Sequence, residues 1–152
     1  MTAPPPRSPQ QRKQDTLHRF EHDVDAWVAT ASADGTPYMV PLSFLWDGQS
    51  LIVSTTATSA TGRNLLAGGK VRIGIGLVRD VVLIDGTVRA TPAAELPAEV
   101  GDAFAAKAGF DPRKEPESYY YFHITPLRIQ AWREANELAG RTLMRDGRWT
   151  VG

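Results

Sequence analysis

The chain has 152 residues, of which 42% are hydrophobic, and this size and composition fit one globular domain with a buried core. Lys plus Arg and Asp plus Glu number 17 each, and this balance argues against nucleic acid or an anionic membrane as a partner. The absence of cysteine excludes disulfides and thiolate sites and favours the cytoplasm. The three histidines lack metal-binding spacing, and no apolar run has membrane-spanning length, so we expect neither metal nor membrane.

The N-terminal segment 1–14 is rich in proline and polar residues. Such a composition predicts a disordered tail, or an arm that lies on a partner, ahead of one domain over residues 15–152. The first predicted helix is Asp15–Asp25, where Asp15 can serve as the N-cap.

The next stretch predicts three strands followed by a short helix. Thr36–Trp46 alternates between its two faces and lies between the turn dipeptides Asp34-Gly35 and Asp47-Gly48. Because proline cannot donate a backbone hydrogen bond, Pro41 places this strand at a sheet edge or beside a ligand. A short β-rich run over 51–56 then leads to a helix capped by Thr58 or Ser59.

The second half of the chain is also rich in predicted strands. These strands are Val71–Leu77, Val81–Arg89 with a bulge at Asp85-Gly86, Tyr119–Ile124, Arg128–Trp132, and a hairpin over Leu143–Val151. One further helix is expected over Leu96–Ala108, ending at Gly109. Six to eight sequential strands with two or three short helices predict a mainly β fold, a small antiparallel barrel.

The start of the short helix also suggests a ligand. Backbone N–H groups and hydroxyls at a helix start attract phosphate, and here they follow directly on a predicted sheet. This arrangement predicts a site for a flat, phosphorylated cofactor.

Three stretches of the chain carry a family resemblance. They read ADGTPYMVPLSFLWDG, LIVSTTATSATGRNL, and YYYFHITPLRIQAW followed by NELAGRTLMRDGRW. In order and spacing they resemble the pyridoxamine 5′-phosphate oxidase-like family of FMN-binding split β-barrel proteins, and the first two are also typical of flavin/deazaflavin oxidoreductases of that fold. The resemblance implies a homodimer with two FMN sites at the interface, each built from both chains.

The resemblance also assigns candidate cofactor-binding residues. The strand of flavin contacts falls on Tyr38, Met39, Val40, Pro41, Leu42 and Ser43, and a second pair of contacts falls on Ser54 and Thr55. The phosphate-binding run falls on Ser59, Ala60 and Thr61, followed by Arg63 and Asn64, and the flavin-contacting Trp and Arg fall on Trp132 and Arg141.

Two departures from the family pattern affect the expected ligands. The family's phosphate-neutralising Arg-Lys pair is Ala60-Thr61 here, so Arg63, Arg79 or an arginine of the other subunit must supply the charge. The family's substrate-holding Arg and His are replaced by Glu137 and Ala139. Because a free carboxylate repels phosphate, we expect a substrate other than pyridoxamine phosphate.

The sequence thus predicts an FMN-dependent oxidoreductase acting on an unknown small molecule, with no catalytic side chain identified. Two alternatives stay open: a reductase of the same fold that uses the deazaflavin F420, and a non-catalytic flavin-binding or storage dimer. The lost charge at Ala60-Thr61 counts against F420, whose longer acidic tail would need a basic channel.

Overall fold

The computed structural model describes residues 3–152. Its α-helices are α1 (Pro9–His22), α2 (Ala60–Leu66) and α3 (Ala98–Ala108), and its 3-10 turns are η1 (Ala93–Glu95), η2 (Pro112–Lys114) and η3 (Ala135–Glu137). Its strands are β1 (Asp25–Ala31), β2 (Pro37–Trp46), β3 (Leu51–Thr56), β4 (Val71–Leu77), β5 (Asp80–Pro92), β6 (Tyr119–Trp132), β7 (Thr142–Arg145) and β8 (Arg148–Trp149).

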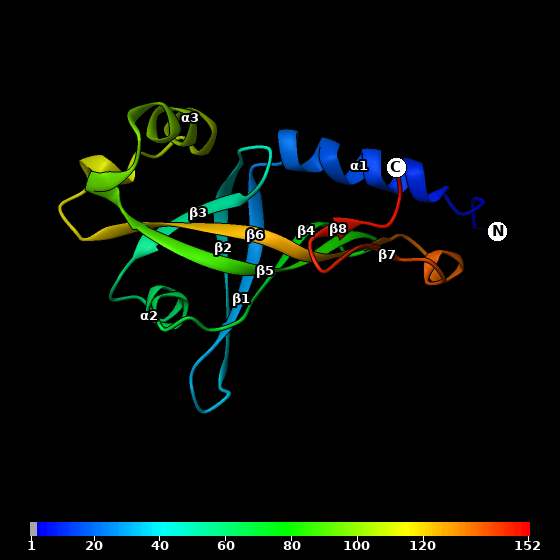
Figure 1. Cartoon of the computed structure of the whole chain (residues 1–152), viewed down its shortest axis with the longest axis horizontal. Helices are drawn as coiled ribbons and strands as arrows, with labels where there is room; N and C mark the ends of the chain where they lie inside the picture. Colours follow the sequence, from blue (N-terminus) through cyan, green and yellow to red (C-terminus); the bar gives the residue numbers. More distant parts are fainter. Residues whose placement is uncertain (1–2) are drawn as a thin grey trace.

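Six antiparallel strands close into a barrel (Figure 1). The sheet runs in the order β3-β2-β1-β4-β5-β6, and β6 then pairs with β3 from Leu51↔Ile124 to Thr56↔Tyr119. The short strands β7 and β8 extend the sheet beyond β6. The predicted mainly β, antiparallel split barrel is therefore confirmed.

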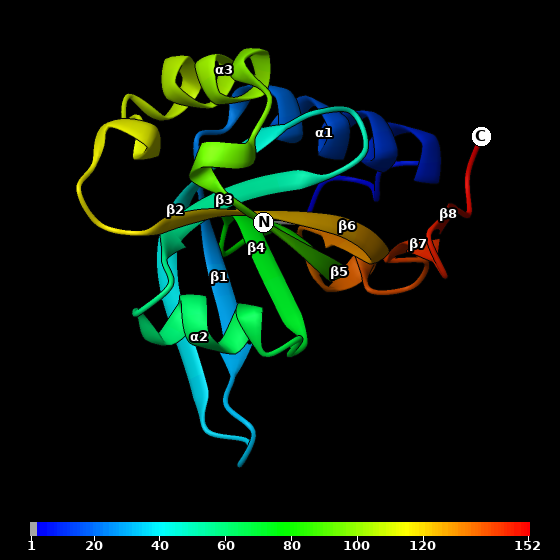
Figure 2. The same ribbon diagram turned by 60° about the vertical axis from the view of Figure 1, so that its left-hand side comes forward.

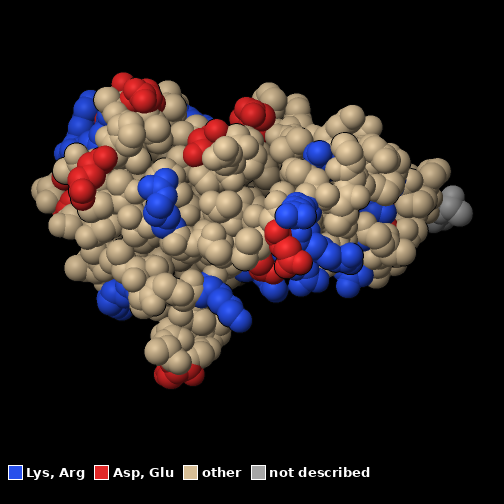
Figure 3. Space-filling view, in the orientation of Figure 1, with Lys and Arg blue, Asp and Glu red and all other residues tan. Residues whose placement is uncertain are grey.

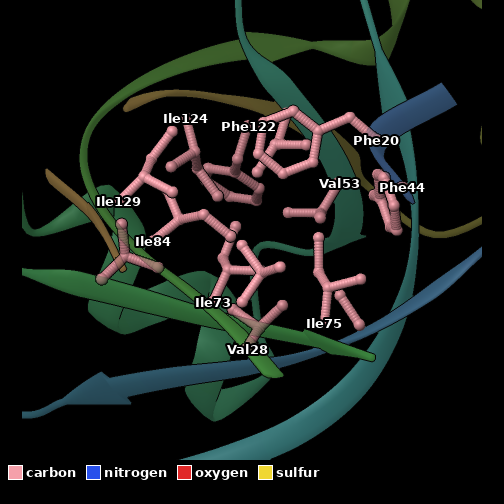
Figure 4. Close-up of a cluster of buried hydrophobic side chains, with 14 of the residues drawn as sticks. Phe20, Val28, Phe44, Val53, Ile73, Ile75, Ile84, Phe122, Ile124 and Ile129 are labelled. Atoms are coloured by element: carbon pink, nitrogen blue, oxygen red, sulfur yellow. The ribbon is translucent and has the colours of Figure 1, made fainter. Parts of the chain in front are cut away.

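Alternating apolar residues of the strands fill the barrel (Figure 4). Because neighbouring side chains on a strand point to opposite faces, Ile73 and Ile75 of β4 both reach the interior and are at most 2% exposed. Aromatic side chains from three other elements join them: Phe20, Phe44 and Phe122, all fully buried.

The helices cover two sides of the barrel. In both ribbon views α1 and α3 lie on one side and α2 on the other (Figures 1 and 2). Helix α3 buries Phe104 in a second, smaller core with Leu96, Ile52 and Tyr121, where the Phe104 and Tyr121 rings meet edge to face at 5.3 Å. None of the helices within residues 3–152 is long and apolar enough to cross a membrane.

The structure corrects the prediction for the N-terminus. Helix α1 begins at Pro9 and not at Asp15, and the Ser8 hydroxyl caps it by accepting the Gln11 N–H at 3.1 Å. The predicted disordered tail 1–14 is therefore wrong for Pro9–Gln14, because the Ser-Pro start signal lies within the proline-rich segment. Residues 1 and 2 of that predicted tail lie outside the described residues.

The structure also joins two predicted strands into one. Tyr119–Trp132 is a single strand, β6, and Pro126 lies within it opposite Gly86. The predicted irregularity at Asp85-Gly86 is confirmed, since the register shifts there. A Cβ on Gly86 would lie 2.6 Å from the Thr125 carbonyl oxygen, so glycine permits the close approach that keeps β6 continuous past its proline.

Candidate functional site

One edge of β2 is free along most of its length. Strand β3 pairs only with Phe44–Trp46, whereas β1 pairs with β2 from Pro37 to Ser43 on the other side. Pro41 lies in the part of β2 that is paired on one side only, which confirms its predicted place at a sheet edge. Beyond Ser43 the strand enters the closed barrel, so the free edge ends at a split in the wall.

A cleft of about 490 Å³ lies at this split. Five of the predicted cofactor residues line it: Pro41, Leu42, Ser43, Ser54 and Thr55. The remaining lining residues are Asp25, Phe104, Phe110 and Tyr119, which the sequence analysis did not assign to the site. Their local sequence gave no signal for such a role, because these residues belong to β1, to α3 and the loop after it, and to β6, which meet at the cleft only through tertiary packing.

The added residues give the cleft an aromatic wall and one carboxylate. The rings of Phe110 and Tyr119 pack edge to face at 5.5 Å. The Ser43 hydroxyl donates to the Asp25 carboxylate at 2.8 Å. Among the described residues that line the cleft, Asp25 is the only one with a carboxylate side chain.

The start of α2 adjoins this cleft through hydroxyl groups. The Thr55 and Ser59 hydroxyls lie 3.0 Å apart, and Ser59 also accepts the Gly62 N–H at 3.0 Å. Ser59 is the helix cap, as predicted. The cleft therefore continues, by way of Thr55, to the predicted phosphate-binding segment.

The other predicted residues of α2 differ in accessibility. Thr61 is 2% exposed, and the Asn64 amide donates to the Thr30 hydroxyl at 3.0 Å, so Asn64 ties the helix to β1. Arg63 is exposed, and its guanidinium donates to the Thr58 carbonyl, which brings the positive charge back to the start of α2. Of the predicted phosphate ligands, Arg63 is exposed, whereas Ser59 is half-buried and its hydroxyl also donates to the Thr56 carbonyl at 2.9 Å.

The first part of β2 lies on a projecting hairpin, apart from the residues that line the cleft. Tyr38 and Met39 are 45% and 60% exposed, and Val40 is half-buried. In Figure 3 the projecting arm is largely uncharged up to an acidic tip.

Met39 also belongs to an exposed apolar face. A groove of about 250 Å³ crosses the outer side of β1, β4 and β5. Beside Met39, the exposed members of this face are Trp27 at 52%, Leu77 at 70% and Val78 at 97%. Exposed apolar surfaces of this kind are typical of interaction sites in proteins.

Trp132 and Arg141 lie together, but far from the cleft. The Arg141 guanidinium lies over the Trp132 ring at 5.9 Å. Trp132 ends β6, whereas Tyr119 at its beginning lines the cleft. A strand of 14 residues spans roughly 40 Å, so one chain does not bring the two groups of predicted residues together.

Glu137 is not the free carboxylate that the sequence analysis expected. It is 2% exposed, and the Arg7 guanidinium binds both of its oxygens, at 2.8 and 3.0 Å. The hydrogen bonds from Arg7 hold the pKa of this carboxyl at about 2, well below its usual range. Because its charge is neutralised inside the protein, repulsion of a phosphate by Glu137 is not an argument about substrate.

Arg79, the other local candidate for the phosphate charge, lies at the far end of the molecule from α2. It pairs with Glu134 at 3.0 Å, in the loop that follows Trp132, and is 82% exposed. Within the part of the chain that the structure describes, Arg63 is the arginine that reaches the start of α2.

The fold places the chain among split-barrel proteins, and a hydroxyl-lined cleft lies at its barrel wall. The family model described as pyridoxamine 5′-phosphate oxidase matches residues 17–133. The chain belongs to this family. No curated protein matches the sequence.

Solved structures of similar proteins share the fold at low sequence identity. A protein titled F420 reductase is 19% identical, with a TM-score of 0.59 over 74% of this chain and 93% of that one. General stress protein 26 of Bacillus anthracis is 14% identical, with a TM-score of 0.59 over 82% and 96%. A Clostridium acetobutylicum protein related to general stress protein 26 is 14% identical, with a TM-score of 0.58 over 84% and 92%.

Proposed function

We propose that the protein is an FMN-dependent oxidoreductase that acts on a small molecule without a phosphate group. The observation that carries this proposal is the cleft, where five residues assigned to the flavin line one wall and adjoin the start of α2 through Thr55 and Ser59. The arrangement fits a phosphorylated ring system, because the cleft combines the Ser54 and Thr55 hydroxyls with the aromatic rings of Phe110 and Tyr119. The Arg63 guanidinium lies just outside the cleft lining, at the start of α2, where it could meet a phosphate.

The chain's own residues would bind and orient the cofactor. Ser59 and Arg63 would hold the phosphate, and the free edge of β2 near Pro41–Ser43 would offer backbone groups to the ring. When bound, FMN supplies the redox chemistry by accepting a hydride from one molecule and passing the electrons to another. The protein would direct the substrate to the ring and exclude water with the aromatic wall.

The working form would be a homodimer, because Trp132 and Arg141 lie at the opposite end of β6 from the cleft. A second copy could bring its own pair to the first copy's cleft, and the exposed face of Trp27, Met39, Leu77 and Val78 is the surface that supports such pairing.

Replacing Leu77 with glutamate should convert the dimer to monomers. The charge would be buried in an apolar interface, and FMN affinity should fall in parallel because each site needs both chains. Sedimentation velocity and FMN titration measure the two effects. Val24→Glu, at an exposed apolar residue outside this face, is the control. A Leu77→Glu protein that stays dimeric would contradict the assignment of the interface.

Replacing Arg63 with alanine should raise the Kd for FMN about tenfold, because a charge-assisted hydrogen bond to phosphate is lost. Riboflavin, which lacks the phosphate, should bind both proteins equally. Isothermal titration with both ligands gives the comparison, and Arg145→Ala, at an exposed arginine of β7, is the control. Equal FMN affinity of Arg63→Ala and the native protein would show that the phosphate charge comes from elsewhere.

Among the described residues, the cleft lining includes the carboxylate of Asp25 and no cationic side chain, which favours an uncharged or cationic substrate. We expect the FMN-loaded protein to bind pyridoxamine about tenfold more tightly than its 5′-phosphate, and Asp25→Asn to narrow this difference. Equilibrium dialysis measures both ligands, with Asp146→Asn in the β7–β8 turn as the control. Preference for the phosphate by the native protein would contradict this proposal.

The test of the whole proposal is the identity of the bound chromophore. The purified protein should release FMN on denaturation, identified by its mass and visible spectrum. Release of F420 would favour the deazaflavin alternative, whose cofactor is named for one similar structure. Bound FMN that no nicotinamide donor reduces would favour the storage alternative. A colourless protein that binds neither cofactor would refute the proposal.

A further inference from the structure

The loop that follows Trp132 is fastened to the N-terminal segment by a buried ion pair. Glu137 in this loop accepts hydrogen bonds from Arg7 through the guanidinium and through the backbone N–H at 2.8 Å. It also accepts the backbone N–H of Arg133 at 2.9 Å. The side chains of Arg7 and Glu137 are only 9% and 3% exposed. One carboxylate thus joins the start of the chain to both ends of a turn near its other end.

A second arginine holds the same loop by its backbone. Arg12, on α1, is 4% exposed and donates to the carbonyl of Glu137 at 2.8 Å and to those of Ala131 and Ala139 at 3.4 Å. These carbonyls lie before, within and after the turn η3. Since a guanidinium has its donors in a fixed plane, Arg12 constrains the path of the loop as well as its position.

A third set of contacts ties the loop to the β4–β5 turn. Arg133 pairs with Asp80 at 3.2 Å, and Asp80 in turn pairs with Arg19 of α1 at 3.0 Å. Asp15 of α1 pairs with Arg7 at 3.0 Å. Three segments that are far apart in sequence therefore share one network of charges.

The held loop carries both distant cofactor candidates at its ends. Arg141 donates to the Leu138 carbonyl at 2.9 Å, its own carbonyl accepts the Ala131 N–H at 2.9 Å, and its guanidinium lies over Trp132. A shift of the turn would therefore move the Arg141 side chain and its carbonyl together. We infer that Arg7, Arg12 and Glu137 are positioning residues, which hold Trp132 and Arg141 in the geometry that the partner's flavin requires.

This inference rests on the proposed function. The free-energy cost of burying the two charges of Arg7 and Glu137 supports the inference. A buried ion pair adds little net stability over an apolar pair of similar size, because both charges lose their hydration. What such a pair adds is a defined geometry, especially when the hydrogen bonds are bidentate. Here the ion pair defines the geometry of an otherwise exposed loop, since the residues on either side of Glu137, namely Ala135, Asn136 and Leu138, are exposed.

The test is a double-mutant cycle in the full-length protein, with FMN as the probe. Arg7→Lys keeps a positive charge beside Glu137 but loses the bidentate contact of the guanidinium, and it should raise the Kd for FMN about fivefold. In an Arg141→Ala background the same substitution should change the Kd less than about twofold, because the residue through which Arg7 acts is gone. Glu137→Gln is the second variant and should behave in the same way. All titrations are made well below each variant's Tm.

The matched control is Glu134→Gln, which removes an ion pair within the same loop. Glu134 and its partner Arg79 are 41% and 82% exposed, so the loss of this pair should leave the Kd unchanged. Equal effects of Arg7→Lys in the two backgrounds, or no effect of either Arg7→Lys or Glu137→Gln, would overturn the positioning role. A native protein that binds no FMN would instead refute the proposed function, so the two failures are distinguishable.

Discussion

Replacing Gly62 with alanine should lower the free energy of unfolding by about 3 kcal/mol and abolish FMN binding. The added Cβ would lie 2.0 Å from the Thr56 carbonyl oxygen, which belongs to the end of β3. Because this neighbour is backbone, it cannot turn aside as a long side chain could. Helix α2 would have to move away from β3, and Ser59 and Arg63 would move with it.

Urea unfolding and FMN titration measure the two parts of this prediction. The control for stability is Gly74→Ala, because a Cβ there would make only ordinary contacts, 3.5 Å from the Leu83 side chain. If Gly62→Ala unfolds at the same urea concentration as Gly74→Ala, the close packing of α2 on β3 is wrong. If it is destabilised yet binds FMN normally, α2 is not part of the site.

Replacing Glu137 with glutamine should lower the free energy of unfolding by about 3 kcal/mol at pH 7, because Arg7 loses its buried bidentate partner and keeps only the more exposed Asp15, at 3.0 Å, as a close counter-charge. The Arg7 and Arg133 backbone N–H groups donate to different oxygens of Glu137, so glutamine keeps an acceptor for only one of them, and the loss of this hydrogen bond adds to the loss of the charge. Glu134→Gln, which affects an exposed pair on the same loop, should cost less than about 1 kcal/mol.

The pH dependence gives this prediction an independent check. The pKa of Glu137 is lowered from 4.5 to about 2 by Arg7, so its contribution is complete above pH 4.5 and is lost as the pH falls towards 2. The difference in unfolding free energy between the native protein and Glu137→Gln should therefore shrink by about 2 kcal/mol between pH 7 and pH 3. A difference that is constant with pH would mean that Glu137 is not ionised in the folded protein.

Local sequence features predicted the barrel well, because each acts over a few residues. The alternation of Thr36–Trp46, the cap at Ser59 and the irregularity at Asp85-Gly86 all occur where they were expected. The prediction failed where a local signal was outweighed. Pro126 suggested a break in β6, but the glycine opposite it, far away in sequence, allows the strand to continue.

The candidate site was predicted only in part, for the same reason. Pro41–Ser43, Ser54 and Thr55 form one wall of the cleft, as a strand pattern and a family resemblance can indicate. Asp25, Phe104, Phe110 and Tyr119 complete it, and they come from elements that meet there only after the barrel has closed. Their side chains gave a local signal for packing alone.

The sequence by itself determined most of the strands, the turns between them and the Ser59 cap of α2, since alternation and backbone conformation depend on near neighbours. Only the tertiary structure decided which charged side chains pair with each other. Glu137 stands in the sequence as an acidic residue in a polar segment, yet the fold places Arg7, 130 residues away, against both of its oxygens. A carboxylate repels or attracts according to its neighbours in space, and those neighbours are fixed by the folding of the whole chain.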